Sequence, residues 1–492
     1  MRSVLITISL TLLASCSKDV RIGETQSVTK NEFMRVTQTD DFSQTRSLFY
    51  DDNQNIYVAG RFNGTISFKA EVSNDTFTAP GTDAVYITKL DKDGAYEWTR
   101  ILGDSGTSYA RPKDIRVDSL GNIIILGDFT GTLDTNPGPG SQTLTSNGNQ
   151  DIFLVKLDQN GDFITSFNIG NTGYDDSESL EIDSSDNIYY AGTIHGKSTD
   201  TDFDPTVGSD NLAAPGGFNS YDVFVTKINS DNSYAWTYYV GSSGTEWTGA
   251  VDVDNTGNVY FSAKYSGTID LDNSGGTVNH TSVGSHDIFI LKISSTGNYL
   301  DSISIGGDQS ESVYDIDVDT SGDIIVTGSH QSTNFEFDPG AGSQTSGTNG
   351  DIDIYLAKYD SSLDLIWSHS IGSDQSDRAH ALDVGDDGTV YLAGYFSGTM
   401  DADPGTNNYS IGPHTNGVAD TLILKLNSSG DYLNSYHLGS SGSDQIYDLK
   451  LVGEEVAVVG GFRSPAFPSG VYTTESETLT GNENGFILKF ED

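Results

Sequence analysis

Cysteine, basic residues and helical hydrophobic periodicity are all scarce in this 492-residue chain. Its single cysteine, Cys16, cannot form a disulfide within the chain, so the fold depends on packing. Lysine and arginine number 25 against 70 aspartates and glutamates, which gives a formal net charge of -45. Because such a chain repels phosphate backbones, we expect no nucleic-acid partner. No apolar pattern of helical period extends over any length, which argues against a helical domain.

A lysine-containing strand motif is repeated instead. Its clearest copy reads Asp-Ile-Phe-Leu-Val-Lys-Leu at 151–157. The lysine returns at a nearly constant spacing of 64 to 71 residues, at Lys89, Lys156, Lys227, Lys292, Lys358, Lys425 and Lys489. A period of this constancy over seven copies predicts a repeat architecture.

Each period contains four short apolar runs, which we name A to D, separated by turn residues. Examples are A at 115–118, B at 122–127, C at 151–157 and D at 98–103. Runs rich in Ile, Val, Tyr and Phe favour strands. Four strands in each of seven repeats predict an all-β fold, a seven-bladed β-propeller of four-stranded blades.

The first strand of the domain should close the ring. The chain ends just after the seventh C run, so only six D runs follow a C run. The missing D run matches residues 33–37 near the N-terminus. We therefore predict that the N-terminal strand completes the last blade of a domain spanning 32–492, because this removes an open sheet edge.

The repeat resembles the SBBP-type β-propeller repeat family. The resemblance rests on an Asp-x-x-Gly-Asn-Ile-Tyr-x-Ala-Gly run, of which 118–127 is a variant, on a Phe-Asp-Pro-Gly-like run after it, and on the Asp-x-Phe-x-x-Lys strand. It covers about residues 32–492. It implies a propeller fold, but members of that family mostly lack a defined activity, so it implies no mechanism.

The N-terminus resembles the export signal of bacterial lipoproteins. Arg2 precedes an apolar stretch at 4–13, which is too short to span a membrane. Leu-Ala-Ser-Cys at 13–16 then resembles a lipobox, which implies a signal peptide at 1–16, lipidation of Cys16 and a flexible tether at 17–31. Ser17 after the cysteine favours an outer membrane or the cell surface of a Gram-negative bacterium. The alternative is an ordinary secretory signal with a chance cysteine.

Long B–C connections hold the first candidate site. In an up-and-down blade these connections and the D–A crossings share one face, where binding residues collect. Five of the loops carry oxygen-bearing side chains at i and i+2, which lie on the same side of an extended segment and suit structural Ca²⁺. The alternative is plain turn chemistry. The pairs are Asp134 and Asn136, Asp202 and Asp204, Asp270 and Asp272, Glu336 and Asp338, and Asp401 and Asp403.

Repeats one and seven lack this pair and supply a second candidate site. They carry Arg61-Phe62 and Phe462-Arg463 after run B, and the two repeats should be neighbours across the ring closure. A cationic, aromatic gap in an acidic rim suits an acidic or glycan ligand, although core packing of the aromatic rings is the alternative. Non-repeated basic residues in or beside the D–A crossings are further ligand-binding candidates: Arg111, Lys113, Arg378 and His380.

No catalytic residue can be assigned from the sequence. The eight histidines occupy unrelated repeat positions, and no nucleophile elbow precedes a helix. We expect a monomeric, membrane-anchored, non-catalytic binding or scaffold module for a protein or glycan. The alternative is a carbohydrate-active hydrolase or lyase with its site at the central channel. An enzyme should show one pocket of convergent, non-repeated polar groups, whereas a scaffold should show seven-fold monotony.

Overall fold

The structure is a computed structural model. It describes residues 30–68, 76–195, 200–206, 208–213, 215, 217, 220–339, 344–405, 407–413, 415–439, 441–453, 455–463 and 482–491. The expected signal peptide, the expected lipidation site Cys16 and all of the expected tether except its last two residues lie outside these ranges. The described residues form forty strands, and none of them forms a helix that is long and apolar enough to cross a membrane.

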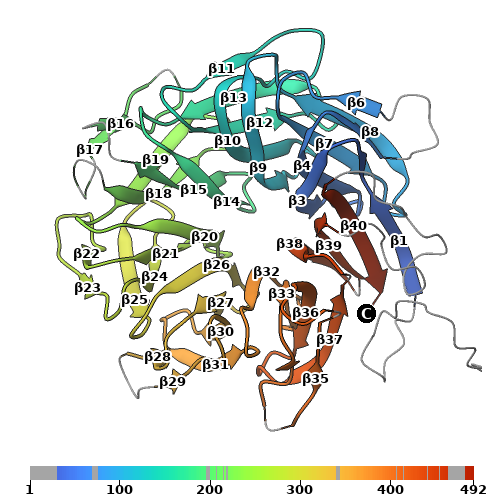
Figure 1. Cartoon of the computed structure of the whole chain (residues 1–492). Helices are drawn as coiled ribbons and strands as arrows, with labels where there is room; N and C mark the ends of the chain where they lie inside the picture. Colours follow the sequence, from blue (N-terminus) through green and yellow to red (C-terminus); the bar gives the residue numbers. More distant parts are fainter. Residues whose placement is uncertain are drawn as a thin grey trace, which may run out of the picture.

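Seven four-stranded antiparallel sheets surround a central axis, which confirms the predicted seven-bladed β-propeller (Figure 1). Blade 1 consists of β3 (Phe42–Tyr50), β4 (Ile56–Asn63), β7 (Ala84–Leu90) and β8 (Tyr96–Leu102). Blade 2 consists of β9 (Thr107–Val117), β10 (Ile123–Asp134), β12 (Asp151–Leu157) and β13 (Phe163–Ile169). Blade 3 consists of β14 (Asp176–Ile182), β15 (Ile188–His195), β18 (Tyr221–Ile228) and β19 (Tyr234–Val240).

The remaining blades repeat the order from the innermost strand A to the outermost strand D. Blade 4 consists of β20 (Trp247–Val253), β21 (Val259–Tyr265), β24 (Asp287–Ile293) and β25 (Tyr299–Ile305). Blade 5 consists of β26 (Glu311–Val318), β27 (Ile324–His330), β30 (Asp353–Tyr359) and β31 (Leu365–Ile371). Blade 6 consists of β32 (Arg378–Val384), β33 (Val390–Phe396), β36 (Asp420–Leu426) and β37 (Tyr432–Leu438).

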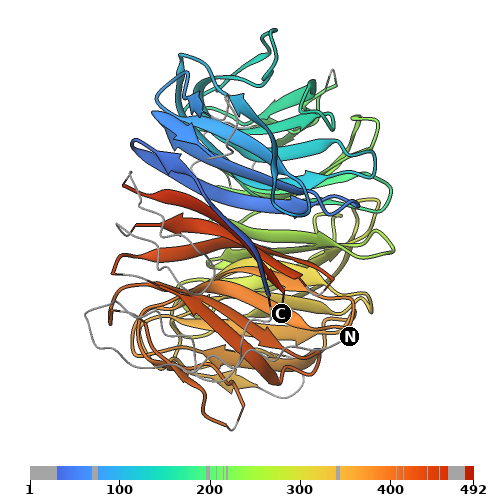
Figure 2. The ribbon, with the colours of Figure 1, turned by 90° about the vertical axis from the view of Figure 1, so that its right-hand side faces the viewer.

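Blade 7 closes the ring as predicted. It consists of β38 (Asp444–Val452), β39 (Glu455–Phe462), β40 (Asn484–Glu491) and β1 (Lys30–Val36). β1 pairs antiparallel with β40, and the two lie side by side in blue and red in Figure 2. The seam to blade 1 is held by Arg35, whose Nε donates to the Gly94 carbonyl at 3.1 Å, and by Lys489, whose Nζ donates to the Lys92 carbonyl at 2.9 Å.

The two faces of the disc differ in their connections. Tight A–B and C–D turns lie on one face, which we call the short-turn face. The B–C connections and D–A crossings lie on the other, the long-loop face. The B–C connections carry small strands of their own, and one further small strand, β2 (Gln38–Thr39), lies in the D–A crossing between blades 7 and 1. The small strands of the B–C connections are β5 (Thr65–Ser67), β6 (Thr76–Thr78), β11 (Thr143–Thr145), β16 (Asp200–Asp202), β17 (Asn211–Ala213), β22 (Thr268–Asp270), β23 (Asn279–Thr281), β28 (Phe335–Glu336), β29 (Thr345–Ser346), β34 (Met400–Asp401) and β35 (Ser410–Ile411).

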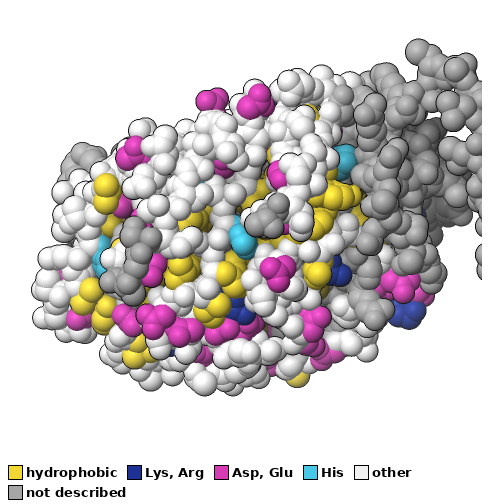
Figure 3. Space-filling view, turned by 90° about the horizontal axis from the view of Figure 1, so that it is seen from below, with side chains coloured by type: hydrophobic (Ala, Val, Ile, Leu, Met, Phe, Trp, Pro, Cys, Tyr) yellow, Lys and Arg dark blue, Asp and Glu magenta, His cyan; other side chains and the backbone are white. Residues whose placement is uncertain are grey.

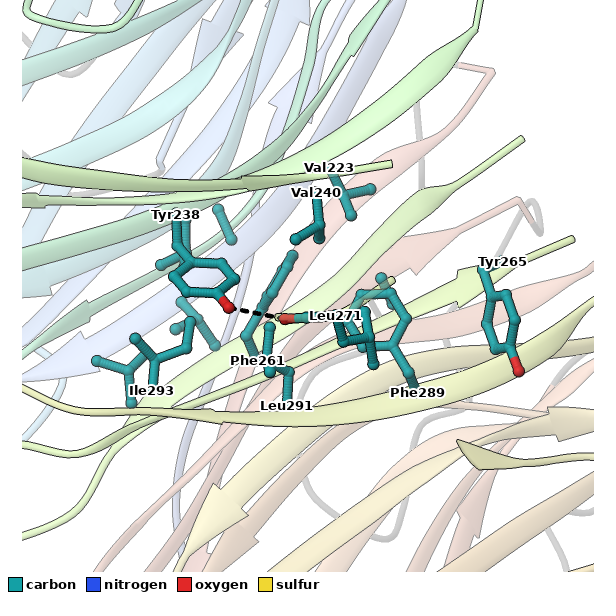
Figure 4. Packing of buried hydrophobic residues seen from close by; sticks show 14 of the residues in the cluster. Val223, Tyr238, Val240, Phe261, Tyr265, Leu271, Phe289, Leu291 and Ile293 are labelled. Atoms are coloured by element: carbon teal, nitrogen blue, oxygen red, sulfur yellow. Dashed lines mark hydrogen bonds between the residues drawn. The ribbon is translucent and has the colours of Figure 1, made fainter. Parts of the chain in front are cut away.

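The hydrophobic core lies between neighbouring blades. Figure 4 shows the layer between blades 3 and 4, where β18 and β19 pack against β21 and β24. Leu271 of a long loop packs into the same layer, and the Tyr238 hydroxyl donates to its carbonyl at 2.7 Å. Each fully buried aliphatic or aromatic side chain contributes about 1.5–3 kcal/mol, so the interfaces between blades stabilise the ring.

The repeated lysine has a structural role. It lies at the short-turn end of strand C, where Lys156 Nζ is 2.9 Å from Asp118 Oδ2 and Lys358 Nζ is 2.7 Å from Asp319 Oδ2. The aspartate closes strand A of the same blade, so each pair ties strand A to strand C. In other blades the amine also lies over the tyrosine that follows the start of strand B, as with Lys227 and Tyr189, 4.9 Å apart.

The aspartate that opens strand C is structural as well. Asp287 is buried, and its Oδ2 accepts the Val283 amide at 2.9 Å, which closes the end of the long loop. The glycine that follows strand D, Gly306, lies against this carboxylate, and a Cβ there would collide with it. The glycine therefore recurs together with the aspartate because a residue without a Cβ leaves room for the aspartate side chain.

Candidate functional site: the central channel

A β-bulge in every A strand determines what faces the channel. The pairing of each A strand with strand B shifts register near its middle, for example between Thr45 and Ser47 in blade 1. A bulge presents an extra side chain and bends the strand. The bulged residue differs from blade to blade: Arg46, Lys113, Glu178, Gly249, Tyr314, His380 and Tyr447.

The short-turn end of the channel opens into a cavity of about 790 Å³ that touches all seven A strands. Its floor is a ring of residues placed three positions after the bulge. The ring holds four carboxylates and two cations. Six of its residues line this cavity, namely Phe49, Glu181, Asp252, Asp317, Asp383 and Lys450, and the seventh, Arg116, lines a smaller cavity in the middle of the channel.

Most carboxylates of this ring connect one blade to the next through hydrogen bonds to backbone amides. Asp252 Oδ2 accepts the Val318 amide at 2.6 Å, and Asp317 Oδ2 accepts the Val384 amide at 2.8 Å. Asp383 continues the series with the Leu451 amide at 2.6 Å. Because each bond joins consecutive A strands, these side chains hold the inner ring together.

Burial raises the pKa of these acids. Burial, followed by the neighbouring Asp383, raises the pKa of Asp317 to about 6, and burial together with Asp317 raises the pKa of Asp252. Burial also raises the pKa of Asp315, one level higher in the channel, to about 8. Lys450 Nζ lies 3.2 Å from Asp383 Oδ1 and offsets part of this negative charge.

A second, smaller cavity of about 110 Å³ lies in the middle of the channel, at the level of the bulged residues. His380 is enclosed there: its Nδ1 is 2.7 Å from the Ile446 carbonyl, and its ring stacks on Tyr447 with centroids 5.9 Å apart. Burial, with smaller contributions from Arg46 and Arg378, lowers the pKa of His380 to about 4. His380 is therefore neutral at pH 7 and is not a cationic ligand.

The long-loop end of the channel collects cations and aromatic rings. Arg46 lies over Tyr447 at 4.3 Å, and Lys264 lies over Trp247 at 4.4 Å. Arg378 is near both Lys264 and the Tyr395 ring. Among the described residues, Arg46, Lys264 and Arg378 have no carboxylate within 4 Å.

The structure separates the predicted gap residues into two groups. Phe62 and Phe462 are fully buried in the interblade core, so the alternative of core packing holds for both. Arg61 lies over the Phe42 ring at 4.8 Å and 3.8 Å from Asp83. Arg463 is exposed, and its Nε donates to Glu483 at 2.8 Å.

The predicted residues of the D–A crossings do converge on the channel. Arg111 lies on β9 with its guanidinium 3.2 Å from Asp128, and Lys113 Nζ is 2.6 Å from Glu178. With Arg378 and His380 they surround the long-loop half of the channel. Sequence reasoning missed Arg46, Tyr447, Trp247 and Lys264, although all four lie at A- or B-strand positions that predicted residues occupy in other blades.

The acidic pairs of the long loops close turns. Asp134 Oδ1 accepts the amides of Asn136 at 3.0 Å and Gln142 at 2.9 Å, and Asp270 makes the same contacts with Asp272 and Val278. The residue between each pair points into the blade and is buried: Thr135, Phe203, Leu271, Phe337 and Ala402. In the part of the chain that the structure describes, no three His, Cys, Asp or Glu side chains are grouped to hold a metal ion. Calcium binding by these loops stays a prediction.

Acidic side chains are scattered over much of the face in Figure 3, where Lys and Arg show at few places. Against this background the cations of the channel are concentrated. The seven blades therefore do not contribute the same residues to the channel. Its long-loop end is cationic and aromatic, and its short-turn end is acidic.

Comparisons with known proteins agree with a propeller repeat protein. An uncharacterised WD repeat-containing protein of Acanthamoeba polyphaga mimivirus is 24% identical over 283 residues, which cover 50% of this chain and 20% of that protein. The regulatory protein FlaEY of Caulobacter vibrioides is 26% identical over 179 residues, 36% of this chain and 18% of that protein. The matches thus span about a fifth of the length of these curated relatives. No protein-family model matches the chain.

Solved structures that resemble the chain have diverse roles. Sqt1 from Chaetomium thermophilum has a TM-score of 0.41 at 11% identity and covers 94% of this chain and 99% of its own. A virginiamycin B lyase from Staphylococcus aureus has a TM-score of 0.40 at 10% identity, with 92% and 98% covered. A polysaccharide lyase described as an ulvan lyase has a TM-score of 0.43 at 10% identity, with 86% and 93% covered.

Proposed function

We propose that this protein is a non-catalytic binding module that takes an acidic glycan at the long-loop end of its channel. One observation carries this proposal. In a chain of net charge -45, cations gather at this end, and three of them have no carboxylate within 4 Å among the described residues. Cations interleaved with aromatic rings suit a ligand that offers negative charge and apolar ring faces.

We further propose that a lipid on Cys16 anchors the protein at the outer membrane or the cell surface, and that it belongs to the SBBP-type repeat proteins. Lys30, where β1 begins, pairs with Glu491 at the short-turn end of blade 7. A tether that joins the domain there turns the short-turn face towards the membrane. The long-loop end then faces away from the membrane, where a large ligand can reach it.

A carbohydrate-active enzyme with its site in the channel is the second candidate. The paired carboxylates Asp252 and Asp317 on the wall of the short-turn cavity favour it, since such pairs can share a proton. Both, however, accept backbone amides of the next blade, which is a structural role. The binding module therefore accounts for more of the channel.

Binding of defined polysaccharides tests the main proposal. The chain from residue 17 onward, which keeps every described strand, is applied to immobilised acidic and neutral polysaccharides at 50 and 200 mM salt. We expect binding to acidic polymers only, weakening at higher salt because surface charges are screened. Equal binding to dextran, or no binding to any acidic polymer, contradicts the proposal. Depolymerisation of a bound polymer would favour the enzyme instead.

The anchor has its own test. We expect the full chain to incorporate a labelled fatty acid and to fractionate with membranes, since several buried acyl chains hold a protein there stably. The Cys16→Ala variant should lose the label and become soluble. Membrane association of this variant without label would show that lipid on Cys16 is not the anchor.

A further inference from the structure

Three arginines from neighbouring strands meet at the long-loop end of the channel between blades 7, 1 and 2. Arg46 is the bulged residue of β3, Arg61 lies on β4 and Arg111 lies on β9. Arg61 and Arg111 share the ring of Tyr109, at 5.6 and 5.9 Å from its centroid. Arg46 lies over Tyr447 at 4.3 Å. Aromatic faces therefore hold the flat sides of the guanidinium groups, which leaves their N–H edges for hydrogen bonding.

The carboxylates around this cluster contact only two of its three arginines. Arg111 pairs with Asp128 at 3.2 Å and lies 3.8 Å from Asp176, and Arg61 is 3.8 Å from Asp83. Arg46 has no carboxylate within 4 Å among the described residues. Three aspartates thus lie beside Arg111 and Arg61, whereas Arg46 has no direct carboxylate partner.

The acid that reaches furthest towards Arg46 is already engaged. Glu483 Oε1 accepts Gln44 Nε2 at 2.7 Å and the Tyr447 hydroxyl at 3.2 Å, while its Oε2 accepts Arg463 Nε at 2.8 Å. In addition, the Nε atoms of Arg46, Arg61 and Arg111 are buried, and no hydrogen-bond partner lies within reach in the described structure. Unsatisfied buried donors are rare in native proteins because they cost free energy.

The arginines also repel one another. Burial lowers the pKa of Arg46; Tyr447 opposes this shift, whereas Arg111 and Arg61 add to it. Burial raises the pKa of Asp83 to about 6 despite Arg61, so this carboxylate gives incomplete compensation near pH 6. A partly buried cation without a counter-charge destabilises the folded state, and an anion that binds beside it removes that cost.

We propose that Arg46, Arg61 and Arg111 form a pocket for one oxyanion, the sulfate or phosphate ester group of a ligand bound at the long-loop end. This rests on the proposed binding function and specifies the chemical group that is recognised. Planar guanidinium forks bond oxyanion oxygens in pairs, and three neighbouring forks can together bond the several oxygens of a tetrahedral group. Arg46, which has no carboxylate partner, supplies a positive charge that a sulfate monoester or a phosphodiester can balance.

Thermal unfolding of the chain from residue 17 onward in millimolar sodium sulfate, sodium phosphate or sodium acetate, at ionic strength fixed with sodium chloride, tests the pocket. Sulfate stabilises many proteins unspecifically, so the response of Arg46→Gln is measured beside that of the unmodified chain. We expect sulfate and phosphate to raise the melting temperature, and Arg46→Gln and Arg61→Gln each to weaken the apparent affinity at least tenfold.

Arg100→Gln is the matched control. Arg100 lies on the outer strand β8 and donates to the Gly161 carbonyl at 3.3 Å, so this variant should keep the full response to both anions. Equal responses of Arg46→Gln and the unmodified chain overturn the inference, and so does a response to acetate as large as that to sulfate. Sulfated and phosphorylated polymers distinguish the two ester sources. If acidic polysaccharides bind Arg46→Gln as strongly as the unmodified chain, the oxyanion pocket is contradicted but the proposed binding function is not. If free sulfate binds but no polymer does, the pocket is supported and the proposed binding function is contradicted.

Discussion

At the short-turn end of the channel every described cation lies against a carboxylate, whereas at the long-loop end Arg46, Lys264 and Arg378 do not. Lys450 lies 3.2 Å from Asp383, and Arg116 contacts Asp114 and Glu181. The carboxylates of the short-turn end in turn accept amides from the next blade. Cations with a structural role are therefore paired with carboxylates. The cations without a carboxylate lie at the end of the channel where an acidic ligand can supply the counter-charge.

Removing a cation should thus have opposite consequences at the two ends. The largest effect is expected for Lys450→Met. Burial lowers the pKa of Lys450, but Asp383 more than offsets this and the pKa lies above its ordinary value. Its loss leaves several carboxylates without a cation, and we expect a loss of about 3 kcal/mol in the free energy of unfolding, measured with urea at pH 7. The exposed Lys92→Met serves as control. An equal loss of stability in this variant would show that the effect of Lys450→Met is not specific to the short-turn end of the channel.

The acids of the short-turn half should make stability depend on pH. The pKa of Asp315 is raised to about 8 and that of Asp317 to about 6, both above the unfolded value near 4. The folded state therefore binds more protons, and this contribution is complete below about pH 4 and is lost as pH rises to 8. Turn carboxylates with a lowered pKa, such as Asp254, favour the folded state above about pH 4.

We therefore expect maximal stability at about pH 4–6 and a decline towards pH 8, measured as unfolding free energy at pH 5, 6, 7 and 8. Asp315→Asn should reduce the number of protons released on unfolding by about one between pH 5 and 7. An unchanged slope in this variant would show that Asp315 is ionised in the folded protein. The exposed Asp93→Asn should leave the slope as it is.

At the long-loop end the corresponding substitutions should be mild. Burial lowers the pKa of Lys264, and Arg378 lowers it further, so the charged form is disfavoured. We expect Lys264→Met to change the free energy of unfolding by less than about 1 kcal/mol or to increase it, because it removes a repelled cation and keeps the packing against Trp247. A loss comparable to that of Lys450→Met would mean that this end is structural too. The same variant should weaken binding of acidic polysaccharides.

The smallest effect is expected for calcium. Five loop sites with a dissociation constant near 1 mM would together add about 2 kcal/mol at 1 mM calcium. Because the first acidic residue of each pair also closes a turn, we expect calcium to raise the melting temperature only slightly relative to chelator. A rise of several degrees would establish the loops as metal sites and would indicate that the functional site lies in the loops rather than in the channel.

Much of this architecture is readable from the sequence. The lysine period gives the blade count, and the match of residues 33–37 to the D runs gives the closure by β1, because both depend on local patterns that each blade repeats. The same logic identifies Arg111, Arg378 and His380 as unrepeated. It fails for Phe62 and Phe462, which look like ligand contacts beside an arginine but point into the interblade core.

What the sequence determines by itself is thus the repeat: strands of period two, turns built on aspartate and glycine, and a ring of seven blades. The tertiary structure alone decides the channel. A bulge shifts the alternation of each A strand by one residue, so pattern reasoning cannot tell that Arg46, Lys113 and Tyr447 face the axis. Residues as far apart in the chain as Arg46 and Tyr447 become neighbours only when the ring closes, and their electrostatics depend on burial that the closed ring creates.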